Sequence, residues 1–313
     1  MRWIKSATLA ILLVAFGLLA LKFNQTEEVV HQVNFNQIAE EASPKTVDNR
    51  PVLRVAVAAM ISPKETKKYY NELLRLIGQR LGMRTEFYQR KTYAEINDLL
   101  ETKQIDTAFV CAGPYVSGHE KFGMEIIAVP VVNDQPLYYS YFLVHRDSPI
   151  TTFAELRGKR FAFTDPDSNT GRLVPTYVLA QQDETPESFF GETFFTHSHD
   201  NSIQAVAEGL ADGAAVDSLI WDFMDRINPK YTRFTRIIEK SPPYGIPPIV
   251  VHPDLPLATK ERLRQIFTEL HNDPEAIPLL RLLQIQRFDS GNDEIYDSVR
   301  LMENWLHDHN QDL

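Results

Sequence analysis

Short apolar runs alternate with amphipathic stretches along most of this chain, and this alternation restricts the folds that it can adopt. The run at 52–60 is almost continuously apolar, as expected of a strand buried on both faces of a parallel sheet. Residues 63–81 follow with apolar side chains three and four positions apart, and Gly82 ends that pattern. A buried strand followed by an amphipathic helix opens a βαβ unit. The sequence therefore predicts an α/β protein with doubly wound sheets.

The alternation continues through the rest of the chain. Further strands are predicted at 85–88, 107–110, 126–132, 138–145, 160–164, 192–195, 213–216 and 249–252. Further helices are predicted at 93–102, 148–156, 172–181, 202–210, 218–227, 259–272 and 296–307. Loops are predicted at 111–115 and 165–171, where glycine, proline and short polar residues gather.

A proline-rich segment at 241–248 interrupts the alternation and predicts a crossover between two lobes. We expect the chain to leave the first lobe near Val144 and to return near Gly245. Lobe 1 then comprises 51–145 and 243–313, and lobe 2 comprises 146–242. Ligands of open α/β sheets bind beyond the carboxyl ends of the strands, so the predicted site is the cleft between the lobes.

The N-terminus carries an export sequence. Arg2 and Lys5 precede an apolar run at 7–21, which has the length of a signal-peptide core. Including Trp3 and Ile4 brings the run near membrane-spanning length, so residues 1–23 are either a cleaved signal peptide or a membrane anchor. Whether residues 1–23 are a signal peptide or an anchor, the folded part is expected in the periplasm. The polar, acidic segment 24–50 is predicted to be a linker.

Composition excludes several classes of protein. The formal net charge is -10, which gives no basic face for nucleic acid, so an anion must be bound by local geometry. Cys111 is the single cysteine, which excludes an intramolecular disulfide and a cysteine zinc cluster. By residue type alone, Cys111 is expected to be a small buried side chain.

The strongest local signal is the segment Ser168, Asn169 and Thr170 between a predicted strand and a predicted helix. The first N–H groups of a helix have no partner within it, and the helix dipole favours negative charge there, so this segment suits a phosphate-like anion. Serine, asparagine and threonine are also the preferred N-caps. Binding and simple capping are equally compatible with the spacing.

Two other polar positions follow predicted strands. His199 is an imidazole that an anion could use, or a residue of a helix-capping segment. Asp217 lies just past the strand at 213–216, where it would fit either a cleft contact or a cap. His197 and His199 have no evident further ligands, so neither a metal nor a cofactor is expected. No motif of a nucleophilic or metal-dependent enzyme is present.

Several segments together resemble the phosphate-, phosphite- and phosphonate-binding periplasmic subunits of ABC transporters, the PhnD-like family. The matching order and spacing run over about 51–270. The segments are 61–63, 106–109, 113–115, 145–149, 165–175, 199–207, 211–218 and 241–243. The resemblance implies a type II periplasmic-binding-protein fold, in which two lobes are joined by a hinge around a central cleft. It also implies a small oxyanion as ligand, an ABC transporter permease as partner, and no enzymatic activity.

The resemblance also implies the ligand-binding residues. The helix start supplies Ser168, Asn169 and Thr170, lobe 2 adds His199 and Asp217, and the first-lobe loops add Ser62 and Tyr115. A carboxylate beside an anion is favourable only where it accepts a proton from the anion, because two bare negative charges repel each other. The ligand is therefore expected to carry an O–H group.

The sequence departs from the family at Val110 and Cys111, where phosphonate binders commonly have an aromatic residue followed by glycine. A cysteine at this strand end is similar to the arsenite-binding sensory relatives of the family, which places Cys111 among the candidate ligand contacts. One alternative is therefore an oxyanion sensor that signals to a membrane histidine kinase. Another is a small hydrolase with Cys111 or Ser168 as nucleophile and His199 as base.

Overall fold

The computed structural model describes residues 49–309. The predicted signal or anchor at 1–23 and nearly all of the predicted linker at 24–50 lie outside these residues. Within the described part, no helix combines the length and the apolar character needed to span a bilayer.

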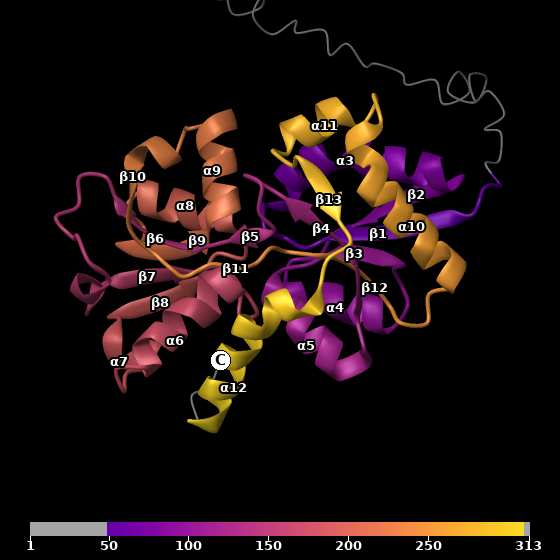
Figure 1. Ribbon diagram of the computed structural model, residues 1–313. Helices are drawn as coiled ribbons and strands as arrows, with labels where there is room; N and C mark the ends of the chain where they lie inside the picture. The colour runs from indigo at the N-terminus through magenta and orange to yellow at the C-terminus, as the bar shows by residue number, and fades with distance from the viewer. Residues whose placement is uncertain (1–48, 310–313) are drawn as a thin grey trace, which may run out of the picture. The chain divides into compact units, whose positions relative to one another are not determined.

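The first lobe is built on a six-stranded sheet in the order β13-β4-β12-β3-β1-β2. Its strands are β1 Val52–Val57, β2 Arg84–Tyr88, β3 Thr107–Phe109, β4 Glu125–Val131, β12 Ile249–Val251 and β13 Arg287–Asp289. Helices α3 Pro63–Leu81, α10 Leu257–Glu269 and α11 Ile277–Leu282 lie on one side, and α4 Tyr93–Glu101 and α5 Ala112–Phe122 on the other (Figure 1). The central strands β1 and β3 pair in parallel and are largely buried, as their apolar sequences predict.

The second lobe contains a five-stranded sheet in the order β10-β6-β9-β7-β8. Its strands are β6 Ser140–His145, β7 Arg160–Phe163, β8 Glu192–Phe195, β9 Gly213–Asp217 and β10 Thr235–Lys240. Helices α8 His199–Ala207 and α9 Ser218–Ile227 cover one face, and α6 Val174–Ala180 and α7 Pro186–Phe189 lie on the other (Figure 1). The loop after β7 contacts the first lobe, where Asp165 accepts a hydrogen bond from the Tyr93 amide.

Two short strands carry the chain between the lobes. β5 Leu137–Tyr138 pairs antiparallel with β11 Tyr244–Gly245. The return crossing includes Gly245, but the first crossing precedes β6 and does not lie near Val144. The physical reason is that the whole of β6 hydrogen-bonds to β9 and β10, so residues 140–145 belong to the second sheet.

The C-terminal helix contacts both lobes. α12 Asp297–Asp308 packs against α5 of the first lobe and against α6 of the second. Trp305 of α12 meets Tyr177 of α6 edge to face, with ring centroids 5.3 Å apart. Figure 1 shows α12 next to both helices. The described C-terminal residues therefore do not all belong to the first lobe.

Local structure departs from the sequence prediction at two loops. The segment 111–115, predicted as a loop, opens helix α5, because Pro114 falls in the first turn, where a missing N–H costs nothing. The predicted loop 165–171 already enters a π-helix at Asn169–Leu173, which continues into α6. Strands β10 and β13 and helices α7 and α11 were not predicted. They are short or lack a clear apolar period.

An aromatic cluster forms the centre of the second lobe. Phe161 of β7 is fully buried, and its ring stacks on Phe190 at a centroid distance of 4.2 Å. The same ring meets Phe163 and Phe153 edge to face at 5.2 Å and 6.5 Å. Such contacts stabilise the lobe beyond the burial of apolar area alone.

Phe161→Ala is expected to lower the free energy of unfolding by about 3–5 kcal/mol, because it leaves a cavity that the surrounding rings cannot fill. The matched control is Phe234→Ala, since Phe234 is 38% exposed. Urea unfolding followed by circular dichroism measures both. An equal loss in the two variants would contradict the assignment of Phe161 to the centre of the lobe.

Candidate functional site

Buried polar side chains gather where the two lobes meet. Six of them each carry an atom with no hydrogen-bond partner among the described residues. These atoms are Tyr93 Oη, Asn169 Oδ1, Thr170 Oγ1, Ser198 Oγ, His199 Nε2 and Asp217 Oδ2. We call these residues the interlobe polar cluster. Buried polar groups are almost always paired, so six unpartnered atoms in one region indicate a binding site for a polar ligand.

The helix start after β7 contributes Asn169 and Thr170. Ser168 is the N-cap, and its Oγ accepts a hydrogen bond from the Gly171 amide at 3.0 Å. Capping therefore accounts for Ser168. The Asn169 Nδ2 donates to the Tyr138 hydroxyl at 2.9 Å, and Thr170 Oγ1 is buried with no hydrogen-bond partner among residues 49–309.

Gly171 allows this close approach of the helix start to β7. A Cβ at Gly171 would lie 2.5 Å from the Thr164 side chain, inside the contact limit of real carbon atoms. The glycine therefore lets the π-helical turn press against the residue that follows the strand. This contact keeps Thr170 inside the cluster.

The geometry of His199 fixes its tautomer. Its Nδ1 accepts a hydrogen bond from the Asp217 backbone amide at 3.1 Å, so the ring proton resides on Nε2. Nε2 is buried and has no partner among the described residues, which leaves one N–H donor facing the cluster. Burial lowers the pKa of His199 to about 3, so the ring is neutral across the physiological range.

Asp217 serves two purposes with its two oxygens. Oδ1 accepts from the Leu219 amide at 2.7 Å and caps α9, whereas Oδ2 is unpartnered in the described structure. Burial raises the pKa of Asp217 to about 7. Burial raises the pKa of Tyr93 and Tyr138, and the nearby charge of Asp217 adds to both shifts. The structure thus confirms the capping role of Asp217, and its contact with a ligand stays a prediction.

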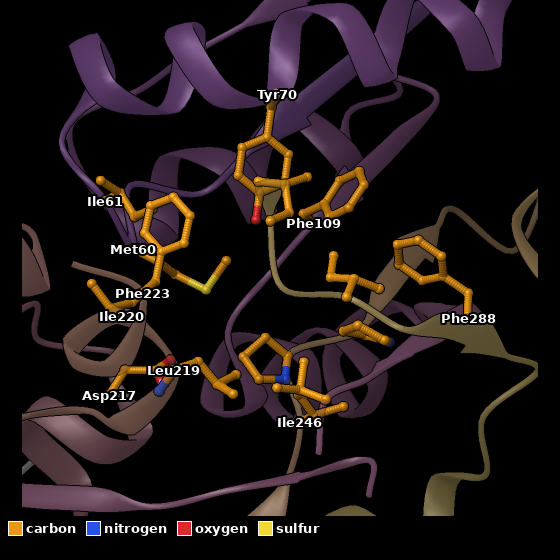
Figure 2. Close-up of a pocket in the computed structure, with 15 residues that line it drawn as sticks. Met60, Ile61, Tyr70, Phe109, Asp217, Leu219, Ile220, Phe223, Ile246 and Phe288 are labelled. Carbon is orange, nitrogen blue, oxygen red and sulfur yellow. The ribbon is translucent and has the colours of Figure 1, made fainter. Parts of the chain in front are cut away.

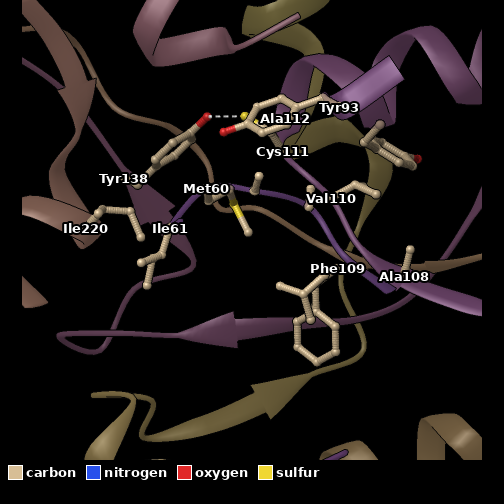
Figure 3. Packing of buried hydrophobic residues seen from close by; sticks show 14 of the residues in the cluster. Met60, Ile61, Tyr93, Ala108, Phe109, Val110, Cys111, Ala112, Tyr138 and Ile220 are labelled. Atoms are coloured by element: carbon tan, nitrogen blue, oxygen red, sulfur yellow. Dashed lines mark hydrogen bonds between the residues drawn. The ribbon is translucent and has the colours of Figure 1, made fainter. Parts of the chain in front are cut away.

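Cys111 lies beside the cluster, at the N-cap of α5. Its Sγ is 3.8 Å from the Tyr138 hydroxyl, and Figure 3 shows Tyr93 and Tyr138 converging on it. The side chain is fully buried, and burial raises the pKa of the thiol to about 11. The residue is therefore a protonated thiol at neutral pH. It packs between the lobes, as its position after β3 predicts.

The other two sequence candidates have different surroundings. The Ser62 backbone amide donates to Asp200 Oδ1 at 2.9 Å and joins the lobes through that bond. The Tyr115 hydroxyl donates to Asp293 at 2.5 Å, and its ring packs on Tyr296. The Tyr115 hydroxyl is thus bonded to the C-terminal segment, and its role as a ligand contact stays a prediction.

Sequence reasoning missed Tyr93, Tyr138 and Ser198. Tyr93 opens α4, and its amide donates to Asp165 of the second lobe at 3.2 Å. Tyr138 lies in a crossing strand, and Ser198 is the N-cap of α8. Ser198 directly precedes His199 and could have been found as a capping residue, whereas nothing near the tyrosines in sequence indicates a site.

Comparison with known proteins identifies the family of this chain. Residues 55–296 match the family model for the periplasmic substrate-binding protein of phosphonate ABC transporters. The phosphonates-binding periplasmic protein of Escherichia coli (strain K12) is 25% identical over 251 residues, which are 79% of this chain and 74% of that protein.

Two solved structures share the fold. The binding-protein component of an ABC phosphonate transporter from Pseudomonas aeruginosa is 25% identical, with a TM-score of 0.76 over 82% of this chain and 86% of that chain. PhnD1 from Prochlorococcus marinus (MIT 9301), solved in complex with methylphosphonate, is 20% identical, with a TM-score of 0.75 over 83% of this chain and 99% of that chain. The fold is that of a type II periplasmic binding protein. Since the family model spans most of the chain, this protein belongs to the periplasmic phosphonate-binding family of ABC transporter substrate-binding proteins.

Proposed function

We propose that this protein captures a phosphate-type oxyanion, namely a phosphonate, phosphite or phosphate, in the interlobe polar cluster and delivers it to an ABC transporter permease. The observation that carries the proposal is the set of six buried polar atoms without partners. Relatives whose names or bound ligands are phosphonates support the ligand class.

The cluster offers the hydrogen-bonding groups that a protonated oxyanion requires. The hydroxyls of Tyr93, Thr170 and Ser198 and the Nε2–H of His199 are donors. Asp217 Oδ2 is an acceptor for the anion's own O–H. The described cluster holds no full positive charge, so recognition rests on oriented dipoles in a dry site, where each hydrogen bond is strengthened by the low dielectric.

Enclosure by the two lobes makes such a site effective. The His199 amide donates to the Met60 carbonyl at 3.0 Å across the lobe interface. The Ser62 and Tyr93 amides donate to Asp200 and Asp165 in the same way. These bonds close the cleft over the cluster, and hinge motion about β5 and β11 would admit the ligand.

The same contacts argue for binding without turnover. A histidine that acts as a general base needs a ring nitrogen that is free to accept a proton. In His199, Nδ1 already accepts a hydrogen bond from the Asp217 backbone amide, and Nε2 carries the ring proton. Burial raises the pKa of the Cys111 thiol to about 11, which disfavours a catalytic thiolate. Transport remains the function that the geometry supports best.

Thr170→Val is expected to weaken oxyanion binding by about 1–3 kcal/mol, or roughly 5- to 150-fold in Kd, because it removes one buried hydroxyl donor without changing shape. Thr176→Val is the matched control, since the Thr176 hydroxyl of the same helix already donates to the Arg172 carbonyl. Isothermal titration with methylphosphonate and phosphite measures both. Equal affinities of the two variants would remove Thr170 from the site.

The pH dependence of binding tests Asp217. The raised pKa of about 7 leaves its carboxyl ionised at higher pH, where the ligand also loses its O–H. Binding then requires uptake of one proton, so Kd should rise about tenfold per pH unit between about pH 8 and pH 9.5. In Asp217→Asn the amide donates permanently, and the slope should flatten. A slope unchanged by this substitution would show that Asp217 shares no proton with the ligand.

We further propose that residues 3–23 hold the protein at the inner membrane. The support is the near-spanning apolar run and its poor small-x-small cleavage pattern. The full-length chain should stay with the membrane fraction after osmotic shock, and replacement of residues 1–23 by a cleavable signal should release it. A shorter mature chain in the wild-type shock fluid would contradict an anchor.

A further inference from the structure

An apolar pocket lies between the lobes and borders the cluster at Asp217 (Figure 2). Its cavity volume is about 70 Å³, which suits a small substituent rather than a whole drug-sized ligand. Its walls are mostly apolar and include Tyr70, Phe109, Leu219 and Phe223.

Both lobes build this pocket. Phe109 ends β3 of the first lobe, whereas Leu219 and Phe223 belong to α9 of the second. Hinge opening would therefore divide the pocket, and closure would complete it. A ligand that occupies this pocket would bind the closed state better than the open state and would therefore favour closure.

Asp217 connects the pocket to the cluster. It is the only charged residue that lines the pocket among the residues described, and its Oδ2 has no partner there. Asp217 thus lines the apolar pocket and also supplies one of the unpartnered polar atoms of the cluster. The carboxyl therefore lies at the junction of the two regions.

We propose that the pocket takes the organic substituent of a phosphonate, and that this substituent is an uncharged alkyl or aryl group. The inference rests on the proposed function and narrows its ligand class. Aromatic and aliphatic walls favour the binding of an apolar substituent, because they remove its surface from water. They offer an ammonium group no acceptor other than Asp217, which the oxyanion already engages.

A ligand series tests the proposal by isothermal titration. Methyl-, n-propyl-, phenyl- and 2-aminoethylphosphonate are compared, together with phosphate and phosphite. Each buried methylene should raise the affinity about fourfold, so n-propylphosphonate should bind roughly 15-fold more tightly than methylphosphonate. 2-Aminoethylphosphonate has the same number of chain atoms as the propyl compound and should bind at least about tenfold more weakly than it, because its charge is desolvated.

A pocket-filling variant tests the location. Leu219→Trp should occupy the space and reduce the propyl-to-methyl affinity ratio to about one. Leu301→Trp is the matched control, because Leu301 of α12 is 69% exposed, and it should keep the wild-type ratio. A ratio that survives in Leu219→Trp would place the substituent elsewhere and overturn the inference.

The two proposals fail in different ways. If methylphosphonate or phosphite binds but propyl and phenyl groups give no gain, or the aminoethyl compound binds most tightly, the apolar-substituent inference is overturned and the oxyanion site stands. If none of the six compounds binds the wild-type protein, both proposals are overturned. A rising affinity from methyl to propyl that Leu219→Trp abolishes supports both.

Discussion

The hydrogen bond from the Asp217 amide to His199 Nδ1 is the contact on which the site depends. It joins the end of β9 to the first turn of α8 and sets the ring proton on Nε2. Reversing the tautomer would turn the donor that faces the cluster into an acceptor, and an anion would then meet a lone pair. The bond also positions the Asp217 backbone, from which the carboxyl caps α9 and still presents one oxygen.

The buried donors of the interlobe polar cluster act on a ligand independently of the net charge of the whole chain. The chain carries a net charge of -10, yet the proposed ligand of its candidate site is an anion. Buried donors with fixed orientation act over short distances, whereas exposed charges are screened by salt within about 10 Å. Neutral His199 and the hydroxyls can thus bind an oxyanion without a matching cation. In the proposed complex Asp217 would add selectivity, because only a ligand able to share a proton with it avoids repulsion.

The sequence predicted the parts of the fold that have strong periodicity. Helices α3 and α9 have the predicted bounds, because their apolar faces and end signals agree. Helix α5 was missed because a glycine and a proline near its start also fit a loop. The first crossing was misplaced because β5 and β6 form one continuous apolar run, and only strand pairing shows where the lobes divide.

For the site, residues on one loop or helix start were predictable and long-range partners were not. Asn169 and Thr170, with His199 and Asp217, follow strands whose ends face the cleft, so the parallel-sheet rule was sufficient. Tyr93 comes from helix α4 of the first lobe, and Tyr138 comes from the crossing strand β5. No local sequence pattern predicts that these distant residues come together. Ser168 was also predicted as a candidate, but its hydroxyl oxygen accepts a hydrogen bond from the Gly171 amide and caps the helix.

Helix α12 affects how long a captured ligand stays bound. Because this helix rests on α5 and α6 together, the lobes cannot part about β5 and β11 unless it detaches from one of them. Loss of the Trp305–Tyr177 contact would accompany detachment from the second lobe. Opening of the lobes must therefore overcome the packing of α12 as well as the hydrogen bonds that cross the cleft.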